Sequence, residues 1–142
     1  MDELVKLLHE GCYSCVIRNS EVRTFTQRGV ADLYDLLSLE PAFLRGAQIA
    51  DKVIGKAAAA LMVLGGVQQI YTDIISEPAL ALLRNAGIKI EYMQAVPRIR
   101  NRANTGWCPM EMICYEVETA EDMFPLIRDF VQQMRNQIKD KG

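Results

Sequence analysis

The 142-residue sequence has few of the side chains from which metal sites and nucleophilic centres are built. It contains one histidine, one tryptophan and four cysteines. Zinc takes three or four ligands from cysteine, histidine and carboxylate side chains. No apolar run approaches the roughly 20 residues that a membrane-spanning helix needs. We therefore expect no metal site, no cofactor and no membrane segment.

An excess of positive charge is also missing. Sixteen Lys and Arg residues against eighteen Asp and Glu residues give a formal net charge of -2. This balance argues against a broad basic surface for nucleic acid. The first residues, MDELVKLLHEG, are amphipathic and acidic, whereas a signal peptide is basic and then apolar. We expect a cytoplasmic protein that binds neither nucleic acid nor membranes.

Half of the residues are hydrophobic, which suits one domain over residues 1–142. Two cysteines form a CxxC, Cys12 and Cys15, which opens the strand-like run CYSCVI. Redox CxxC motifs lie at a helix N-terminus, where the helix dipole lowers a thiol pKa. Both thiols are therefore expected to be buried and structural, and His9 is expected to be a surface or capping residue rather than a metal ligand.

Apolar spacing and turn residues divide the chain into alternating helices and strands. The predicted helices span residues 2–9, 29–40, 51–66, 76–86 and 119–141, with one further turn after Pro41. The predicted strands span residues 12–18, 21–26, 47–50, 67–75 and 88–96, and a last one follows Trp107. The first two strands form a hairpin, and right-handed crossovers make the next three parallel. The prediction is an α/β fold with a mixed sheet, an N-terminal antiparallel hairpin, a βαβαβ core, a C-terminal helix and helices on both faces of the sheet.

Two of these helices begin where a ligand site is expected. Asp51 and Ser76 are the predicted N-caps, and each follows a strand of the parallel set. Open α/β sheets bind ligands at the carboxyl ends of such strands. The two helix starts are therefore expected to form one site.

Three separated stretches, ADKVIGKAAA, YTDIISEPALALLRNAGIKIEY and NRANTGWCPME, resemble a family of small, functionally uncharacterised bacterial domains with the cytidine deaminase-like fold. The resemblance covers nearly the whole chain and implies a three-layer cytidine deaminase-like domain. Catalytic members of this fold hold zinc with a His/Cys-x-Glu motif and a PCxxC motif, each at the start of a helix.

The resemblance also implies that the zinc site is lost. The first motif falls at residues 50–55, with Asp51 or Lys52 at the ligand position and Val53 or Ile54 at the position of the glutamate. The PCxxC motif falls at residues 78–82, where alanine and leucine replace both cysteines. None of the three ligands is retained, and the catalytic acid is absent.

Lys52 and Lys56 are four residues apart, so on a helix from 51 to 66 they share one face near its N-terminus. A phosphate held there by backbone N–H groups and both ammonium groups would make the two cations favourable. The alternative is that both lysines simply extend into water.

The stretch PRIRNRANTGWCPME supplies a second group of candidate residues. Arg98, Arg100 and Arg102 alternate, so an extended chain places them on one side. Arginine pairs with phosphate or carboxylate, and the single tryptophan, Trp107, can stack on a base. The alternative is a solvated loop with a charged stripe.

Two residues are candidates for catalysis. Cys108 would be more acidic near cations, but no histidine accompanies it, so a structural thiol is the alternative. Glu77 is an acid or base candidate, or it is only a favourable partner of the helix dipole.

The first hypothesis is a protein that binds a small anionic ligand, such as a nucleotide or a phosphorylated metabolite. The expected ligand-binding residues are Asp51, Lys52, Lys56, Ser76, Arg102, Asn104 and Trp107. The second hypothesis is a zinc-independent enzyme that uses Cys108 or Lys52 in the same pocket. The third is a structural or regulatory partner. Because deaminase-like folds often assemble, we also expect a homo-oligomer.

Overall fold

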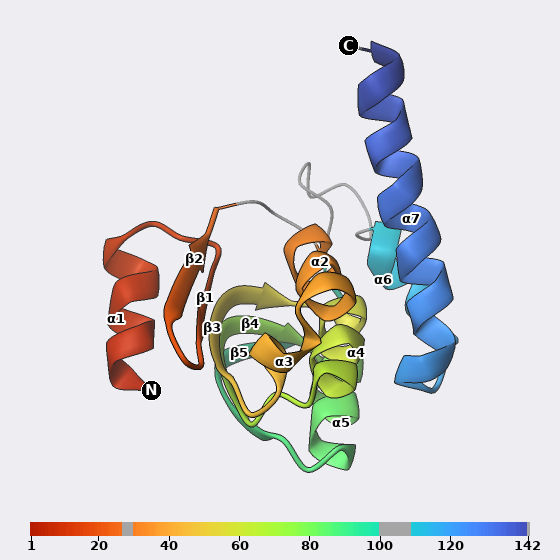
Figure 1. Cartoon of the computed structure of the whole chain (residues 1–142). Coiled ribbons are helices and arrows are strands. Elements are labelled where there is room, and N and C mark those ends of the chain that lie inside the picture. The colour runs from red at the N-terminus through yellow and green to blue at the C-terminus, as the bar shows by residue number, and fades with distance from the viewer. Residues whose placement is uncertain (27–29, 100–108, 142) are drawn as a thin grey trace.

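A mixed sheet forms the centre of the computed structural model, which describes residues 1–26, 30–99 and 109–141. Within these residues the sheet has five strands in the order β2-β1-β3-β4-β5 (Figure 1). Their bounds are Cys15–Arg18 for β1, Val22–Phe25 for β2, Gln48–Ile54 for β3, Gln69–Ser76 for β4 and Lys89–Val96 for β5. β1 runs antiparallel to β2 and β3, whereas β3, β4 and β5 are parallel. The predicted hairpin and the predicted parallel core are both confirmed.

In the described part of the chain, six helices lie on one side of the sheet, which we call the major face (Figure 1). They are α2 (Ala31–Leu39), α3 (Pro41–Leu44), α4 (Lys56–Gly65), α5 (Glu77–Asn85), α6 (Pro109–Cys114) and α7 (Ala120–Lys141). None of the helices in the described residues is long and apolar enough to cross a membrane.

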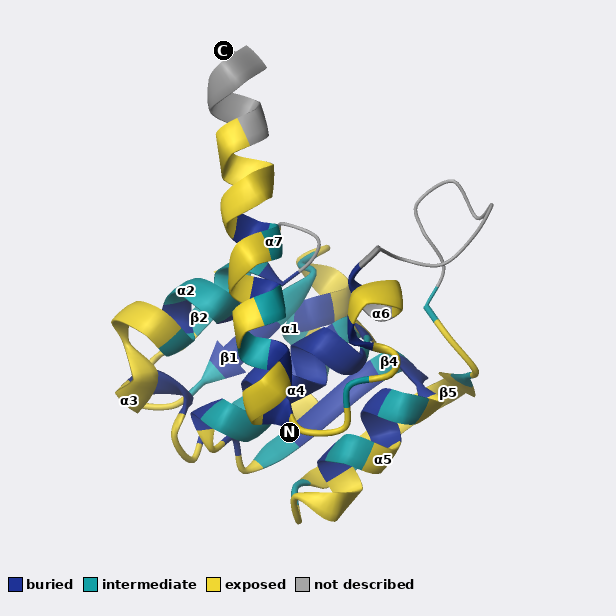
Figure 2. Ribbon diagram, turned by 90° about the vertical axis from the view of Figure 1, so that its right-hand side faces the viewer, coloured by how far each residue is buried: buried dark blue, intermediate teal, exposed yellow. Residues whose placement is uncertain are grey.

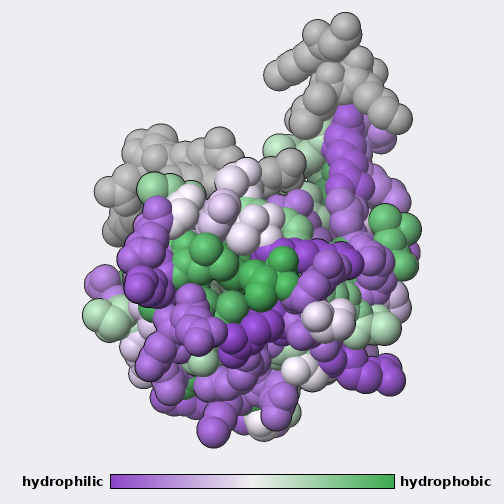
Figure 3. Space-filling view, turned by 60° about the vertical axis from the view of Figure 1, so that its left-hand side comes forward, coloured by the Kyte–Doolittle hydropathy of each residue, from purple (hydrophilic) through white to green (hydrophobic). Residues whose placement is uncertain are grey.

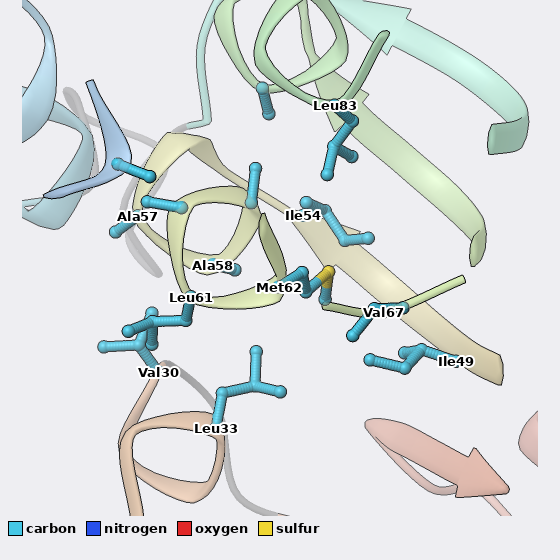
Figure 4. Packing of buried hydrophobic residues seen from close by; sticks show 14 of the residues in the cluster. Val30, Leu33, Ile49, Ile54, Ala57, Ala58, Leu61, Met62, Val67 and Leu83 are labelled. Carbon is cyan, nitrogen blue, oxygen red and sulfur yellow. The ribbon is translucent and has the colours of Figure 1, made fainter. Parts of the chain in front are cut away.

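Helix α4 lies at the centre of the core on the major face. Its residues from Lys56 to Met62 are all buried, and Figure 2 shows the helix dark blue along most of its length. The alanines at 57–60 are small enough to let α4 pack between the sheet and α7. Leu61 and Met62 add the larger side chains; in Figure 4, Leu61 lies beside Val30, and Met62 lies between Ile54 and Val67.

A glycine ends α4 for a packing reason. A Cβ atom at Gly65 would come within 2.8 Å of the Leu44 Cβ, so the close approach of α3 requires a residue without a side chain. Gly66 then takes φ 74, the left-handed conformation that closes many helices. The predicted stop of this helix at the two glycines is confirmed.

The opposite side of the sheet, which we call the α1 face, carries one described helix, α1 (Asp2–Glu10) (Figure 1). Leu4 and Leu8 of α1 are buried against Val16, Ala50 and Tyr71. α1 packs mainly on β1 and β3 and reaches β4 at Tyr71, so it leaves β5 uncovered on this face. On this side of the molecule, hydrophobic side chains form an area bordered by hydrophilic residues (Figure 3).

The predicted start of the helix at Asp51 is wrong. β3 continues to Ile54, Gly55 is the N-cap, and α4 begins at Lys56. Residues 51–54 pair with β4 in parallel, with Asp51 beside Thr72 and Ile54 beside Ile75. β-Branched Val53 and Ile54 favour an extended chain, and their pairing with Ile74 and Ile75 of β4 reinforces that preference.

The predicted last strand is also wrong. Residues 109–114 form helix α6, and a turn follows. Met110 and Cys114 are four residues apart and both are buried, which is a helical spacing that coincides with the alternating pattern.

The predicted caps at Ser76 and Thr119 are confirmed. The Ala79 N–H donates to the Ser76 hydroxyl at 3.3 Å, and the Asp122 N–H donates to the Thr119 hydroxyl at 3.1 Å. Both helices therefore begin at the residue that the sequence pattern predicts.

Candidate functional site

The buried polar residues of the described chain lie on two neighbouring strands and at the start of one helix. They are Asp51, Lys56, Thr72 and Ser76, and each is less than a tenth exposed. Asp51 and Thr72 lie near the middle of β3 and β4, Ser76 is the last residue of β4, and Lys56 is the first residue of α4. We call this group the carboxyl-edge cluster.

Strand pairing brings the cluster together. Asp51 is the register partner of Thr72, and Ile54 is the partner of Ile75. Since β3 and β4 end side by side, α4 and α5 begin next to each other and also pack together. The prediction that two helix starts meet at one edge of the parallel strands is confirmed.

Asp51 is a buried carboxylate that takes its hydrogen bonds from the backbone and a thiol. It accepts from the Val53 N–H at 3.3 Å, from the Lys52 N–H and from the Cys15 thiol. Burial raises the pKa of Asp51 to about 7, and these hydrogen bonds oppose that rise. This carboxyl therefore exchanges its proton near neutral pH.

Cys15 faces Asp51 across the β1–β3 pair. Burial raises the pKa of the Cys15 thiol well above its usual range, and the nearby Asp51 carboxylate adds to the effect. Such a thiol stays protonated and donates to the carboxylate. Cys15 is half-buried and bonds the Asp51 carboxylate, and its structural role stays a prediction, whereas Cys12 is exposed, so the prediction of a buried thiol is wrong for Cys12.

Two side chains of the cluster support an irregular stretch of the sheet. The register of β3 and β4 pairs Asp51 with Thr72 and next pairs Val53 with Ile74. Asp51 accepts from the N–H two residues further along its strand, and the Thr72 hydroxyl donates at 2.9 Å to the carbonyl of Ile74. The side chains of Asp51 and Thr72 therefore hydrogen-bond to backbone groups at the point where the alternation of side chains between the two faces of the sheet shifts.

Lys56 brings a positive charge into the core at the start of α4. The side chain is buried, and its Nζ donates to the Tyr115 carbonyl at 2.8 Å, just after α6. A cation at a helix N-terminus opposes the helix dipole, typically at ~0.3–1 kcal/mol. Lys56 therefore occupies a position where a negatively charged ligand is favourable.

Lys52 does not share a face with Lys56, so that prediction is wrong. It lies in β3, half-buried, and strand alternation places it on the side of Ala50, which packs against α1. The reason is the later start of α4, which leaves one lysine in a strand and the other in a helix.

Ser76 is fully buried, and its hydroxyl serves as the cap of α5. Glu77 follows as the first residue of α5 and is exposed, which suits a favourable partner of the helix dipole. Arg102, Asn104, Trp107 and Cys108 lie outside the described residues.

A second polar group lies on the α1 face and was not predicted. His9 Nε2 lies 2.9 Å and 3.0 Å from the two carboxylate oxygens of Asp73, and the Tyr71 hydroxyl donates to Asp73 at 2.6 Å. Burial and the bond to Asp73 raise the pKa of Tyr71 to about 12. His9 and Asp73 are 64 residues apart, so no local pattern reveals their contact.

A shallow depression between the hairpin and α3 is lined by Arg23, Glu40 and Phe43. Its charges are already matched, because Arg23 bonds Glu40 at 2.9 Å and its guanidinium lies 4.1 Å from the centre of the Phe43 ring. This pairing joins β2 to α3 and argues for a structural role.

Among the described residues, no three His, Cys, Asp or Glu side chains gather where they could hold a metal ion. The model of a family described as TM1506, domain of unknown function (DUF1893), matches residues 3–131. The chain belongs to the DUF1893 family.

A solved structure is similar to this DUF1893 domain over most of its length. It is the crystal structure of the DUF1893 family protein TM1506 from Thermotoga maritima, with a TM-score of 0.83 and 22% sequence identity. The similarity covers 90% of this chain and 87% of that chain, and at this identity it shows the shared fold alone. A comparison with curated proteins finds no match.

Proposed function

We propose that this DUF1893 domain is a cytidine deaminase-like domain without its zinc site, and that it binds a small anionic ligand at the carboxyl-edge cluster. The observation that supports it is that the four buried polar residues of the described chain all lie on β3, β4 and the start of α4, and that two of them, Lys56 and Ser76, stand at this edge. Burying polar groups is costly, so a concentration of them in an apolar core favours a functional role. Open α/β sheets bind ligands at this edge.

The strand order supports the fold assignment. A hairpin comes first, a βαβαβ core follows, and the order is β2-β1-β3-β4-β5. Because α4 begins at Lys56, the first motif moves from residues 50–55 to the start of this helix. Lys56 then stands at the position of a zinc ligand, and Ala58 stands at the position of the glutamate.

The side chains at these positions do not fit zinc. A protonated lysine repels a metal ion, and Ala79 and Leu82, at the positions of the two cysteines, donate no electron pair. The buried ammonium of Lys56 instead supplies positive charge where the relatives with zinc keep theirs. In this proposal the site at the start of α4 therefore favours an anion in place of a metal-bound water.

Lys56 and Asp51 have complementary roles in this proposal. The buried Lys56 donates to the Tyr115 carbonyl at 2.8 Å and places its positive charge at the start of α4. The first-turn amides of α4 point to the same edge and favour negative charge. Asp51, with its pKa raised to about 7, is only partly ionised at neutral pH and repels an anion less than an ordinary aspartate does.

A thermal-shift comparison tests the proposal with inorganic phosphate, ribose 5-phosphate, CMP and AMP as probes. The proteins are the wild type, Lys56→Met and Lys52→Met. Lys52→Met is the matched control, because it removes the same charge on the α1 face. We expect at least one probe, at about 100 times its Kd, to stabilise the wild type and Lys52→Met by roughly 2.7 kcal/mol, and Lys56→Met far less.

Two results would contradict the proposal. One is the absence of any ligand-induced shift in the wild type. The other is an equal shift in Lys56→Met, measured against that variant's own melting temperature, so that a change in basal stability does not enter. The alternative of an enzyme that uses Cys108 or Lys52 gains no support from the described residues, since Lys52 lies on the other face of the sheet.

A further inference from the structure

Helix α6 rests on the core of the major face through a narrow stripe of side chains. It packs against α4 and α7. Of its described side chains, Met110 and Cys114 are buried in the core, whereas Met112 is 60% exposed and Ile113 is 40% exposed (Figure 2). α6 therefore covers the neighbouring helices without being enclosed by them.

The Lys56 ammonium joins two helix ends of opposite polarity. Lys56 is the first residue of α4, where a cation is unfavourable, and it donates at 2.8 Å to the carbonyl of Tyr115, the residue directly after α6. The last carbonyls of a helix are partly negative and favour a lysine. This bond therefore offsets the cost of the charge at the start of α4 and anchors the end of α6.

The same bond separates the ammonium from solution. Lys56 is only 8% exposed, so an anion cannot contact its Nζ while the surrounding residues keep these positions. α4 lies at the centre of the core, and α7 is held by four buried side chains, whereas α6 has six residues and an exposed outer side. Elements with few buried apolar contacts open at the lowest free energy. Movement of α6 is therefore the change that makes the ammonium accessible.

The chain after α6 suits such a movement. The Tyr115 N–H donates to the Met112 carbonyl at 3.4 Å, and the Val117 N–H donates to the Cys114 carbonyl at 3.1 Å. Both bonds stay within α6 and its turn, and residues 117–119 have no regular structure before α7 begins at the buried Ala120. α6 and its turn can therefore move as one piece about residues 117–119.

We propose that residues 109–117 form a gate over the anion site, held shut by the bond from Lys56 to the Tyr115 carbonyl. An anion that binds the Lys56 ammonium replaces this carbonyl, so ligand binding and the closed position of α6 exclude each other. The ligand in this inference rests on the proposed function. The anchoring of α6 by Lys56 does not need a ligand.

Alkylation of Cys114 by iodoacetamide tests the gate on the full chain, with peptide mass spectrometry to resolve the four cysteines. Cys114 is fully buried on α6, so it reacts when α6 opens. Lys56→Met is expected to raise its labelling rate roughly tenfold, because a hydrogen bond from a charged group is lost. Lys52→Met, which removes the same charge from β3, is the control that keeps the wild-type rate. Cys15, in β1, reports unfolding of the sheet and is expected to react equally in all three proteins.

Ligand provides the second arm of the experiment. Inorganic phosphate and CMP are added at concentrations that saturate the thermal shift. A bound probe is expected to raise the labelling of Cys114 in the wild type at least to the rate of ligand-free Lys56→Met, because the anion takes the place of the Tyr115 carbonyl. It is expected to leave the rate in Lys56→Met unchanged.

Three results would overturn the gate. They are equal labelling of Cys114 in the ligand-free wild type and Lys56→Met, an increase matched at Cys15, and slower labelling of Cys114 when a probe is bound. If no probe shifts the melting temperature of the wild type, the proposed function fails and the ligand arm fails with it. The comparison of the ligand-free proteins still decides whether Lys56 anchors α6, so the two failures are distinguishable.

Discussion

Polar side chains are buried on the major face of the sheet and partly exposed on the α1 face. On the major face, six described helices bury a large core, and the polar residues there are buried with it. On the α1 face, one described helix buries a cluster of five residues, and His9, Lys52 and Asp73 remain partly exposed. The difference indicates that the major face holds the fold together, whereas the α1 face is an added layer; the proposed site lies on the major face.

Two aspartates illustrate the contrast. Asp51 takes hydrogen bonds from backbone amides and a thiol and is desolvated. Asp73 bonds a histidine and a tyrosine at the protein surface. A buried carboxylate whose hydrogen bonds do not fully replace its hydration lowers the stability of the fold, and such a loss is tolerated where the group serves a function. An exposed, paired carboxylate lowers stability little.

The largest expected effect comes from truncating one leucine on each face. Leu61 and Leu8 are both fully buried. Leu61→Ala is expected to lower the free energy of unfolding by roughly 3–5 kcal/mol, because the surrounding helices cannot close the cavity. Leu8→Ala is expected to cost less, about 2–3 kcal/mol, because α1 can move toward the sheet. Urea denaturation measures both, and an equal or larger loss for Leu8→Ala would contradict the comparison of the faces.

The next effect is the pH dependence of stability. Burial raises the pKa of Asp51 from 3.8 in the unfolded chain to about 7 in the folded protein, so the folded state holds the proton more tightly. Stability from this group is therefore full below pH 4, falls as the pH rises to 7, and stays low above it.

Asp51→Asn keeps the shape of the neutral acid and cannot ionise. Relative to the wild type, this variant is expected to gain on the order of a few kcal/mol between pH 4 and pH 8. Urea denaturation at the two pH values gives the difference, with Glu118→Gln as an exposed control. A pH dependence identical to that of the wild type would show that Asp51 titrates normally.

The smallest effect is expected at the surface pair on the α1 face. Asp73→Asn weakens the contact with His9 but keeps a polar group beside Tyr71. The loss of stability should stay below about 1 kcal/mol, because His9 is nearly half exposed and such pairs contribute little. Hydrogen exchange should be faster mainly in residues 2–10. A loss above about 2 kcal/mol would show that α1 belongs to the cooperative core.

Much of the fold is predictable from the sequence because period and turn residues agree along most of the chain. The hairpin, the parallel core and the caps at Ser76 and Gly66 follow from such local patterns. Prediction fails at residues 51–55, where the β-branched Val53 and Ile54 stand only two residues before a helix-forming alanine run. It also fails at α6, where alternating and helical spacings coincide.

The site was less predictable than the fold. Ser76 and Lys56 are identifiable from the helix starts, but the burial of Lys56 depends on α6 and Tyr115, 59 residues away. Thr72 was missed, and its only signal is a polar residue inside an apolar strand. The contacts of Asp51 with Cys15 and of His9 with Asp73 arise from strand pairing and helix docking, which local spacing does not encode.

The most direct test of the ligand site is a titration followed by ¹H–¹⁵N correlation spectra, with inorganic phosphate and CMP as probes. The account predicts saturable shifts of the amide signals of residues 55–58, Glu77 and Ala79 in the wild type, retained in Lys52→Met and lost in Lys56→Met. Shifts confined to the α1 face, or unchanged in Lys56→Met, would contradict it.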